Sequence, residues 1–391
     1  MGGGLMQLVA YGAQDIYLTG NPQITFFKVV YRRHTNFAME SIEQTFNGAV
    51  DYNRRVTATI SRNGDLIKDM WLEVFFTKTA TATQKYGYGN ALVKQVEVEI
   101  GGQLIDRQYG EWMDVWSELS TPAGKRLGYD EMVGNTVATA DQNQKLDVPL
   151  MFWFNRNPGL ALPLIALQYH EVKINLDLAE AASVGANMDL TTVKLWVDYI
   201  YLDTDERRRF AQVSHEYLIE QLQFTGDASI SGTTFRTELN FNHPCKELIW
   251  VYQVASQARG GASQQPCQFT TLEDAACTTN PGATAILKLN GQDRFQERRM
   301  EYFRRVQGYK HHTNTARIAT ANKQHIYLYS FALNPEEHQP SGTCNFSRID
   351  NTILSFNNFP SSLSAGIVKV FAVNYNVLRI MSGMGGLAYS N

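Results

Sequence analysis

Tyr201-Leu-Asp-Thr-Asp-Glu-Arg-Arg-Arg-Phe-Ala-Gln-Val213 is a short, highly charged stretch near the middle of the chain. Its composition predicts a helical or extended joint between two larger parts of the molecule. The joint matters because the sequence before it returns, weakly, in the sequence after it.

Four segments of the first half recur in the same order in the second half. The last strand-like run before the joint returns after 175 positions, two segments return after 177, and one returns after 189. We attribute the larger offset to a polar insertion between residues 254 and 283. The matched segments are Val193–Tyr201 with Val368–Asn376, Asn63–Phe75 with Asn240–Tyr252, Asn157-Pro158 and Pro163 with Asn334-Pro335 and Pro340, and Gly102-Gln103 with Gly291-Gln292. A repeat of this length indicates a duplicated domain rather than a solenoid.

Period-2 alternation dominates both halves. Val96, Val98 and Ile100 alternate with Glu97 and Glu99, a pattern typical of a sheet with one wet side. Two further runs alternate in the same way, at 56–60 and 172–178. Polar loops rich in Gly, Thr, Ser and Asn are expected at 77–90, 120–147, 179–191, 254–283, 310–322 and 334–345. Helical patterns are few, and the better candidates are Tyr109–Leu119 and Arg298–Val306, at corresponding places in the two halves.

These patterns predict an all-β fold of two consecutive eight-stranded jelly-roll β-sandwiches with few short helices. The first residues fit neither half, because 14–36 is rich in aromatic and β-branched residues and turns basic at Arg32-Arg33. The expected domains are an N-terminal arm at 1–36, a first jelly roll at 37–203, a linker at 204–213 and a second jelly roll at 214–391.

Composition limits the class of protein. The 391 residues are 44% hydrophobic and 12% aromatic, as in an ordinary globular chain, and the net charge of −3 implies no general affinity for polyanions or membrane surfaces. Cys245, Cys267, Cys277 and Cys344 have no C-x-x-C spacing, so we expect neither a disulfide framework nor a zinc site, and a reducing compartment.

The N-terminus lacks the basic region of a signal peptide. Gly2 suggests N-myristoylation, but Met6 stands where that motif needs Ser or Thr. The longest apolar run, Gly159–Leu167, is too short to span a bilayer. The expectation is a soluble intracellular protein.

Long stretches of the chain resemble a known family. The opening run Gly3-Gly-Leu-Met-Gln-Leu-Val-Ala-Tyr-Gly-Ala-Gln-Asp-Ile-Tyr-Leu-Thr-Gly-Asn-Pro-Gln-Ile-Thr-Phe-Phe-Lys28 is similar to the start of major capsid proteins of nucleocytoplasmic large DNA viruses. The resemblance continues through Val30–Ala38, Ile60–Ile67 and Asn374–Tyr389, and it is greatest to the algal-virus and iridovirus branches. The matched runs cover both ends and the first half.

The resemblance implies a double jelly roll whose homotrimer has a pseudo-hexagonal outline and tiles an icosahedral shell. It implies a virion protein, assembled in the host cytoplasm, whose partners are neighbouring capsomers, minor capsid proteins and an internal viral membrane near the N-terminal arm. Loop tips of such trimers form the outer surface, and the polar loop 254–283 is our candidate for such a tower, with an ordinary disordered surface loop as the alternative.

Catalytic and metal-binding patterns give no site. His311, His312 and His325 could suggest a metal, but adjacent histidines on a strand point to opposite faces, which favours solvent or interface roles. Asp203, Asp205 and Glu206 adjoin three arginines, so charge pairing in the linker is the favoured interpretation over acid–base chemistry. We therefore predict no catalytic residue, no metal and no cofactor, and no enzyme.

The basic run Arg298, Arg299, Arg304, Arg305 and Lys310 is interleaved with Tyr302, Phe303 and Tyr309. Phosphate contacts and base stacking would suit a nucleic acid, but acidic residues are interspersed and the chain is slightly acidic. A subunit interface or a solvated helix face is favoured, with no direct nucleic-acid contact.

Asn345-Phe-Ser347 is the one N-glycosylation sequon, so it marks Asn345 as the candidate glycosylation residue, although a cytosolic protein would not meet the usual transferase. For the whole chain, a structural capsid role is favoured. The alternative is a glycan-binding or hydrolytic double β-sandwich, because jelly rolls also host lectins and cupins.

Overall fold

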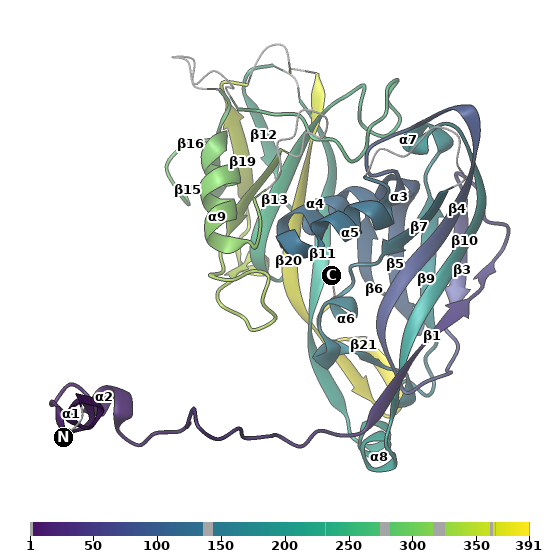
Figure 1. The fold of residues 1–391 in the computed structure, drawn as a ribbon. Coiled ribbons are helices and arrows are strands. Elements are labelled where there is room, and N and C mark those ends of the chain that lie inside the picture. The colour runs from purple at the N-terminus through teal and green to yellow at the C-terminus, as the bar shows by residue number, and fades with distance from the viewer. Residues whose placement is uncertain are drawn as a thin grey trace. The chain divides into compact units, whose positions relative to one another are not determined.

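The computed structural model describes residues 3–135, 144–230, 232–273, 282–315, 325–359, 363 and 365–390, with the backbone alone at 79–82. Residues 1–36 and 37–391 form separate units. The first unit holds two short helices without a buried residue, α1 (Gly3–Val9) and α2 (Ile16–Thr19). Figure 1 shows the ribbon of the second unit.

From residue 37 to the end of the joint, the described residues form ten strands and six α-helices. The strands are β1 (Phe37–Gln44), β2 (Phe46–Asn47), β3 (Arg55–Thr59), β4 (Leu66–Gln84), β5 (Val93–Ile100), β6 (Gln103–Tyr109), β7 (Gln144–Pro149), β8 (Leu162–Pro163), β9 (Val172–Leu178) and β10 (Gly185–Leu202). The helices of 37–212 are α3 (Tyr88–Leu92), α4 (Gly110–Ser120), α5 (Ala123–Val133), α6 (Trp153–Arg156), α7 (Ala181–Val184) and, at the joint, α8 (Thr204–Gln212), with 3₁₀ turns η1 (Pro158–Leu160) and η2 (Leu164–Ala166).

After the joint, the described residues form the remaining strands and two helical segments. The strands are β11 (His215–Ile230), β12 (Phe235–Glu238), β13 (Pro244–Val254), β14 (Thr284–Leu289), β15 (Gln292–Asp293), β16 (Arg298–Arg299), β17 (Ile326–Ser330), β18 (Cys344–Asn345), β19 (Thr352–Asn357), β20 (Gly366–Met381) and β21 (Met384–Leu387). A π-helix, η3 (Tyr302–Val306), runs into α9 (Gln307–His311), and η4 (Phe346–Arg348) is a 3₁₀ turn.

The two halves repeat one topology. In the first half the sheets have the orders β1-β10-β4-β7 and β2-β3-β9-β5-β6. In the second half the orders are β11-β20-β13-β17 and β12-β19-β14-β15, and the short strands β8 and β18 pair with the corresponding strands β4 and β13. Every strand pair is antiparallel and lies within one half. The predicted double jelly roll is confirmed.

Strand pairing corrects one of the repeat offsets. Trp196 pairs with Trp71, and its counterpart 175 positions later, Phe371, pairs with Ile249. Trp71 therefore corresponds to Ile249, an offset of 178 rather than the predicted 177. The difference matters because a shift of one residue exchanges the two faces of a strand.

Alternation correctly identified the core faces. Val56, Ala58 and Ile60, Val96, Val98 and Ile100, and the four apolar residues of β9 are all buried in the first core. A second apolar cluster fills the second roll, around Trp250, Phe303 and Phe356. Glu97, expected on a wet face, is buried and held by Arg55 and Arg107, at 2.6 Å from each.

Several predicted loops are regular structure. Strand β4 continues through Gln84 and pairs with the start of β10, so 77–84 is strand rather than loop. Threonine dominates that segment, and threonine favours extended backbone. Helix α5 lies inside the predicted loop 120–147. The predicted helix Arg298–Val306 begins only after Arg299, because Arg298 and Arg299 pair with β14.

The joint is helical in this structure. Asp203 caps α8 by accepting a hydrogen bond from Thr204 N at 2.8 Å. We predicted that the arginines of the joint pair with its own acidic residues. Arg207 instead pairs with Asp65 of the first half, with 3.0 Å between Nε and Oδ1.

Gly110 allows α4 to start against the preceding elements. A Cβ at this position would overlap the backbone oxygens of Asn90 and Val93. Glu111 stands in the first turn, where a carboxylate interacts favourably with the helix dipole, and Pro122 follows the last turn.

We expect Gly110→Ala to lower the free energy of unfolding by about 1–3 kcal/mol, because overpacking displaces α4. Urea unfolding followed by tryptophan fluorescence measures the change. Gly128→Ala in α5 is the matched control: no atom lies within 4 Å of its added Cβ, so it should be neutral or stabilising. Equal stability of the two variants would contradict the close approach at Gly110.

Candidate functional site: the interface between the two jelly rolls

Helix α4 of the first roll is wedged against the second roll. Its residues Trp112, Val115, Trp116 and Leu119 follow the i, i+3, i+4, i+7 spacing of one helix face and are all buried. They pack on one face of the second roll's sheet, as Figure 1 shows for α4 across β13 and β20. The residues of that face are Ile249, Val251, Ile326, Leu328, Phe371 and Val373. The rolls therefore share an apolar core of their own.

A buried carboxylate joins charges from both rolls beside this wedge. Glu220 of β11 accepts from Arg156 of the first roll and from Lys246 of β13, each at 2.8 Å. The guanidinium of Arg156 lies 4.2 Å from the centre of the Trp116 ring. Burial lowers the pKa of Lys246, and Glu220 partly opposes this effect. Lys246 is fully buried, so its ammonium group would destabilise the fold without its carboxylate partners.

A second buried carboxylate, Glu111, lies at the start of α4. Arg259 and Lys369 of the second roll hold it at 2.6 Å and 3.1 Å. Burial raises the pKa of Glu111, but the two cations outweigh burial and bring the pKa to about 2. The carboxylate therefore stays ionised over the physiological range.

Arg259 belongs to the loop that we expected to form an exposed tower. Its guanidinium also donates to the backbone oxygens of Ala91 and Val93, at 2.9 and 3.0 Å. Further along, Gln264 is buried and donates to Glu180 at 2.5 Å. Residues 254–273 are therefore anchored on the first roll at Arg259 and Gln264, and 274–281 lies outside the described residues. The assignment of this loop to an outer tower stays a prediction.

His312 is a buried ionic histidine. Its Nε2 lies 2.8 Å from Glu247 Oε2 and its Nδ1 lies 2.8 Å from Glu336 Oε1. Burial lowers the pKa of His312, but the two carboxylates outweigh burial and raise it to about 9. The ring also meets Trp116 edge-on at 6.2 Å, so this ion pair supports the wedge from the side of the second roll.

The C-terminal hairpin of the second roll reaches the first roll. Tyr169 N donates to Gly383 O at 3.0 Å, and Leu387 N donates to Gln103 at 3.2 Å. A Cβ on Gly385 would lie 2.6 Å from Leu167, so the close approach needs glycine.

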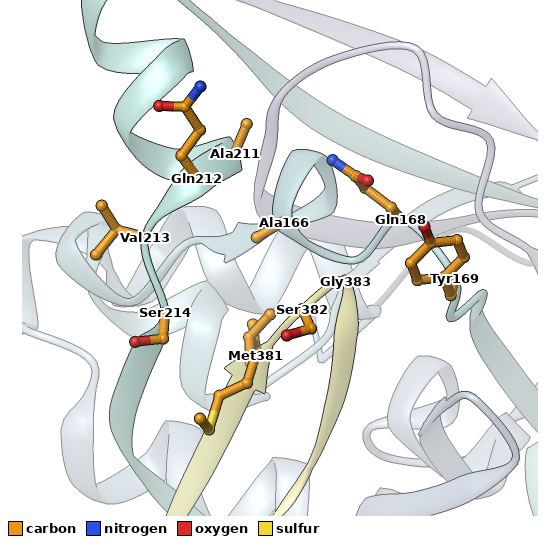
Figure 2. Close-up of a pocket in the computed structure, with 11 residues that line it drawn as sticks. Ala166, Gln168, Tyr169, Ala211, Gln212, Val213, Ser214, Met381, Ser382 and Gly383 are labelled. Carbon is orange, nitrogen blue, oxygen red and sulfur yellow. The ribbon is translucent and has the colours of Figure 1, made fainter.

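A hollow of about 500 Å³ opens beside this hairpin. Figure 2 shows its three walls, which are the end of α8, the segment at Gln168 and Tyr169, and the turn at Met381–Gly383. The linker thus meets both rolls here.

The histidine residues do not form a metal site among the described residues. His311 and His312 lie at the end of α9 rather than on a strand, and His311 faces the backbone oxygen of Leu333. The solvent alternative is wrong for His312, since its side chain is fully buried between carboxylates and its ring contacts Trp116 of the first roll.

The basic run does not form one face. Arg304 is buried and paired with Glu273, and Phe303 belongs to the core of the second roll. Arg305, Tyr309 and Lys310 are exposed.

The sequon residue Asn345 is exposed and accepts from Ser347 N at 3.0 Å. Glycosylation of Asn345 stays a prediction. Cys245 and Cys344 are free thiols, and Cys277 lies outside the described residues. No helix in the described part of the chain combines the length and the apolar character needed to span a bilayer.

We expect Glu220→Gln to cost about 3–5 kcal/mol of unfolding free energy, because it leaves Lys246 and Arg156 without their shared charge. Denaturant unfolding at neutral pH measures this cost. Glu216→Gln on the same strand is the control, because its ion pair with Arg379 is exposed and contributes about 0–1 kcal/mol. Similar losses in both variants would refute the role of burial.

The raised pKa of His312 predicts a dependence of stability on pH. The protonated ring stabilises the fold fully below about pH 6.5, its unfolded-state pKa, and this contribution is lost as the pH rises through about 9. Thermal unfolding can be measured at about pH 6, below the unfolded-state pKa, and at about pH 9.5, above the folded-state pKa. Between these two pH values, the melting temperature of His312→Gln should fall less than that of the unmodified chain. A constant difference between the two proteins would contradict the assignment.

Both halves of the chain match known protein families. Residues 25–203 match a family described as major capsid protein N-terminus, and residues 206–386 match one described as large eukaryotic DNA virus major capsid protein. The major capsid protein of Pyramimonas orientalis virus is 54% identical over 420 residues, and that of Paramecium bursaria Chlorella virus 1 is 46% identical over 445, with both chains fully covered in each case.

Solved structures agree with the sequence comparison. PBCV-1 VP54 superposes with a TM-score of 0.80 at 40% identity, covering 94% of this chain and 100% of that one. The Faustovirus major capsid protein has a TM-score of 0.76 at 12% identity, covering 95% and 94%, which shows the shared fold alone. The chain belongs to the major capsid protein family of large eukaryotic DNA viruses.

Proposed function

We propose that this chain forms a homotrimeric, pseudo-hexagonal capsomer that tiles the icosahedral shell of a large double-stranded DNA virus. Its family is one of structural capsid proteins. The observation that supports the trimer best is the fixed pair of equivalent rolls, joined by a buried interface, because three such pairs supply six similar units. A closed trimer satisfies each copy's contacts without open-ended growth.

The proposal divides the chain into an arm at 1–36, a first jelly roll at 37–203, a linker at 204–213 and a second jelly roll at 214–391. Support comes from strand pairing within each half and from the family matches, which end at 203 and begin at 206. We assign the arm to contacts with minor capsid proteins and the internal viral membrane, and the side walls to neighbouring capsomers. Assembly in the host cytoplasm belongs to the same proposal.

The proposed role is packing rather than catalysis, without a cofactor and without direct nucleic-acid contact. The buried charged groups described above support it, because Glu220, Glu111 and His312 each have partners within the interface. The comparisons give no support to a glycan-binding or hydrolytic protein.

We expect light scattering of the purified chain to give about three times its 44.1 kDa mass, with hexagonal outlines in negative stain. The chain lacking residues 1–36 should give the same trimer but fail to build shells, because the arm lies outside the strand-paired unit.

A stable monomer of the full chain would contradict the proposed capsomer. An unfolded truncated chain would show instead that the arm belongs to the core.

A further inference from the structure

Two free thiols face each other across a pair of strands in the second roll. Cys245 of β13 and Cys344 of β18 are direct cross-strand partners. Both side chains belong to the apolar cluster of the second roll, where Cys245 is fully buried and Cys344 is half-buried. Side chains of directly paired residues stand on the same face of a sheet, so the two sulfur atoms are neighbours.

The strand register places the two backbones at the separation that a disulfide needs. Next to this pair, Phe346 N donates to His243 O at 3.1 Å. Hydrogen-bonded and non-hydrogen-bonded pairs alternate along an antiparallel ladder, so Cys245 and Cys344 form a hydrogen-bonded pair, with Cα atoms about 5.5 Å apart. Disulfides bridge Cα atoms that are about 4.4–6.8 Å apart. The bridge therefore fits the strands as they lie.

Cys344 is the thiol that a reagent reaches first. Its strand β18 has two residues, and among the described strands it pairs only with β13. A short strand at the edge of a sheet opens locally at a small cost in free energy. Such an opening uncovers Cys344, and behind it the fully buried Cys245.

We propose that Cys245 and Cys344 are a redox-controlled pair, which stays a dithiol under reducing conditions and closes to a disulfide when the chain meets a small-molecule disulfide such as oxidised glutathione. The inference concerns the single chain and does not depend on the proposed trimer.

The reaction is a thiol–disulfide exchange in two steps. The Cys344 thiolate attacks one sulfur of oxidised glutathione, which releases one glutathione thiolate and leaves a mixed disulfide. The Cys245 thiolate then attacks Cys344 Sγ and releases the second glutathione thiolate. The two cysteines are oxidised, glutathione disulfide is reduced to two thiols, and the two thiol protons pass from the cysteines to glutathione.

The bridge joins the two segments that hold His312. Glu247 follows Cys245 on β13, and Glu336 lies in the segment that leads to β18. Their carboxylates lie 2.8 Å from Nε2 and Nδ1 of His312, and the ring of His312 contacts Trp116 of α4. Oxidation therefore adds a covalent tie beside the interface between the rolls. The tie also closes a long loop, residues 246–343, which constrains the unfolded chain.

Peptide mapping by mass spectrometry tests the pairing. The purified full chain is incubated with oxidised glutathione at about pH 8.5, where more of each thiol is ionised. We expect a cross-linked peptide that contains Cys245 and Cys344 and that dithiothreitol separates. Cys344→Ala should give no such peptide, whereas Cys267→Ala, which removes another buried cysteine, should keep it.

Thermal unfolding tests the consequence. The oxidised chain should unfold about 5–10 °C above the reduced chain, because the bridge constrains the unfolded state. Cys344→Ala should unfold at one temperature under both conditions, and Cys267→Ala should keep the difference. The comparison of oxidised with reduced unmodified chain needs no substitution, so it stands even where a variant folds poorly.

Glutathione that stays on Cys344 without a cross-link, or a cross-link from Cys245 or Cys344 to another cysteine, would overturn the pairing. A Cys245–Cys344 bridge that leaves the unfolding temperature unchanged would overturn its stabilising role.

Discussion

The contact between α4 and the sheet β11-β20-β13-β17 determines how the two jelly rolls sit against each other. Each roll has its own apolar core, although Ile219, Leu378 and Ile380 of the second roll join the first core, and the described strands pair within a roll. The relative position of the rolls depends on Trp112, Trp116 and their neighbours, together with the buried carboxylates Glu111 and Glu220. Apolar burial supplies the favourable free energy, about 25 cal/mol per Å² of buried apolar surface. The buried charges add orientation, because their hydrogen bonds are satisfied in one geometry only.

Much of the fold is readable from sequence, because strand alternation and the repeat both act locally. The buried faces of β3, β5 and β9 follow directly from period-2 patterns, and the helix at α4 follows from its apolar spacing. The predictions that were wrong concern segments whose secondary structure or register is determined by tertiary contacts. The segment 77–84 is polar enough for a loop, but pairing with β10 makes it a strand. The repeat offset was wrong by one residue because sequence similarity alone does not fix strand register, whereas the cross-strand partners of Trp196 and Phe371 do.

The interface was the least predictable part, because its residues come from distant segments. Arg259 lies in a loop of Gly, Ser and Gln that gives no sign of structure, yet it reaches a carboxylate 148 positions earlier. His312 was treated as one of three neighbouring histidines, whereas its partners Glu247 and Glu336 are 65 and 24 positions away. One available signal was the isolated charge in apolar strands: Lys246 and Glu247 are fully buried near the start of a strand that is otherwise mostly apolar. Charges in such places need partners, so they indicate an internal interface.

The duplication explains why one chain can present two different surfaces on the same architecture. After duplication, the same sheet face and the same helix occur twice, and each copy can change independently. The pair within the chain has become apolar, as Ile249 and Phe371 show against α4. The corresponding sheet face of the first roll carries Glu73 and Asp147, and helix α9 of the second roll carries Lys310. The π-helical turn at Tyr302–Val306 follows the same logic, because it turns Phe303 into the core of the second roll while Arg305 and Val306 stay in water. The fold is thus shared between the halves, whereas the side-chain polarity of the two corresponding sheet faces differs.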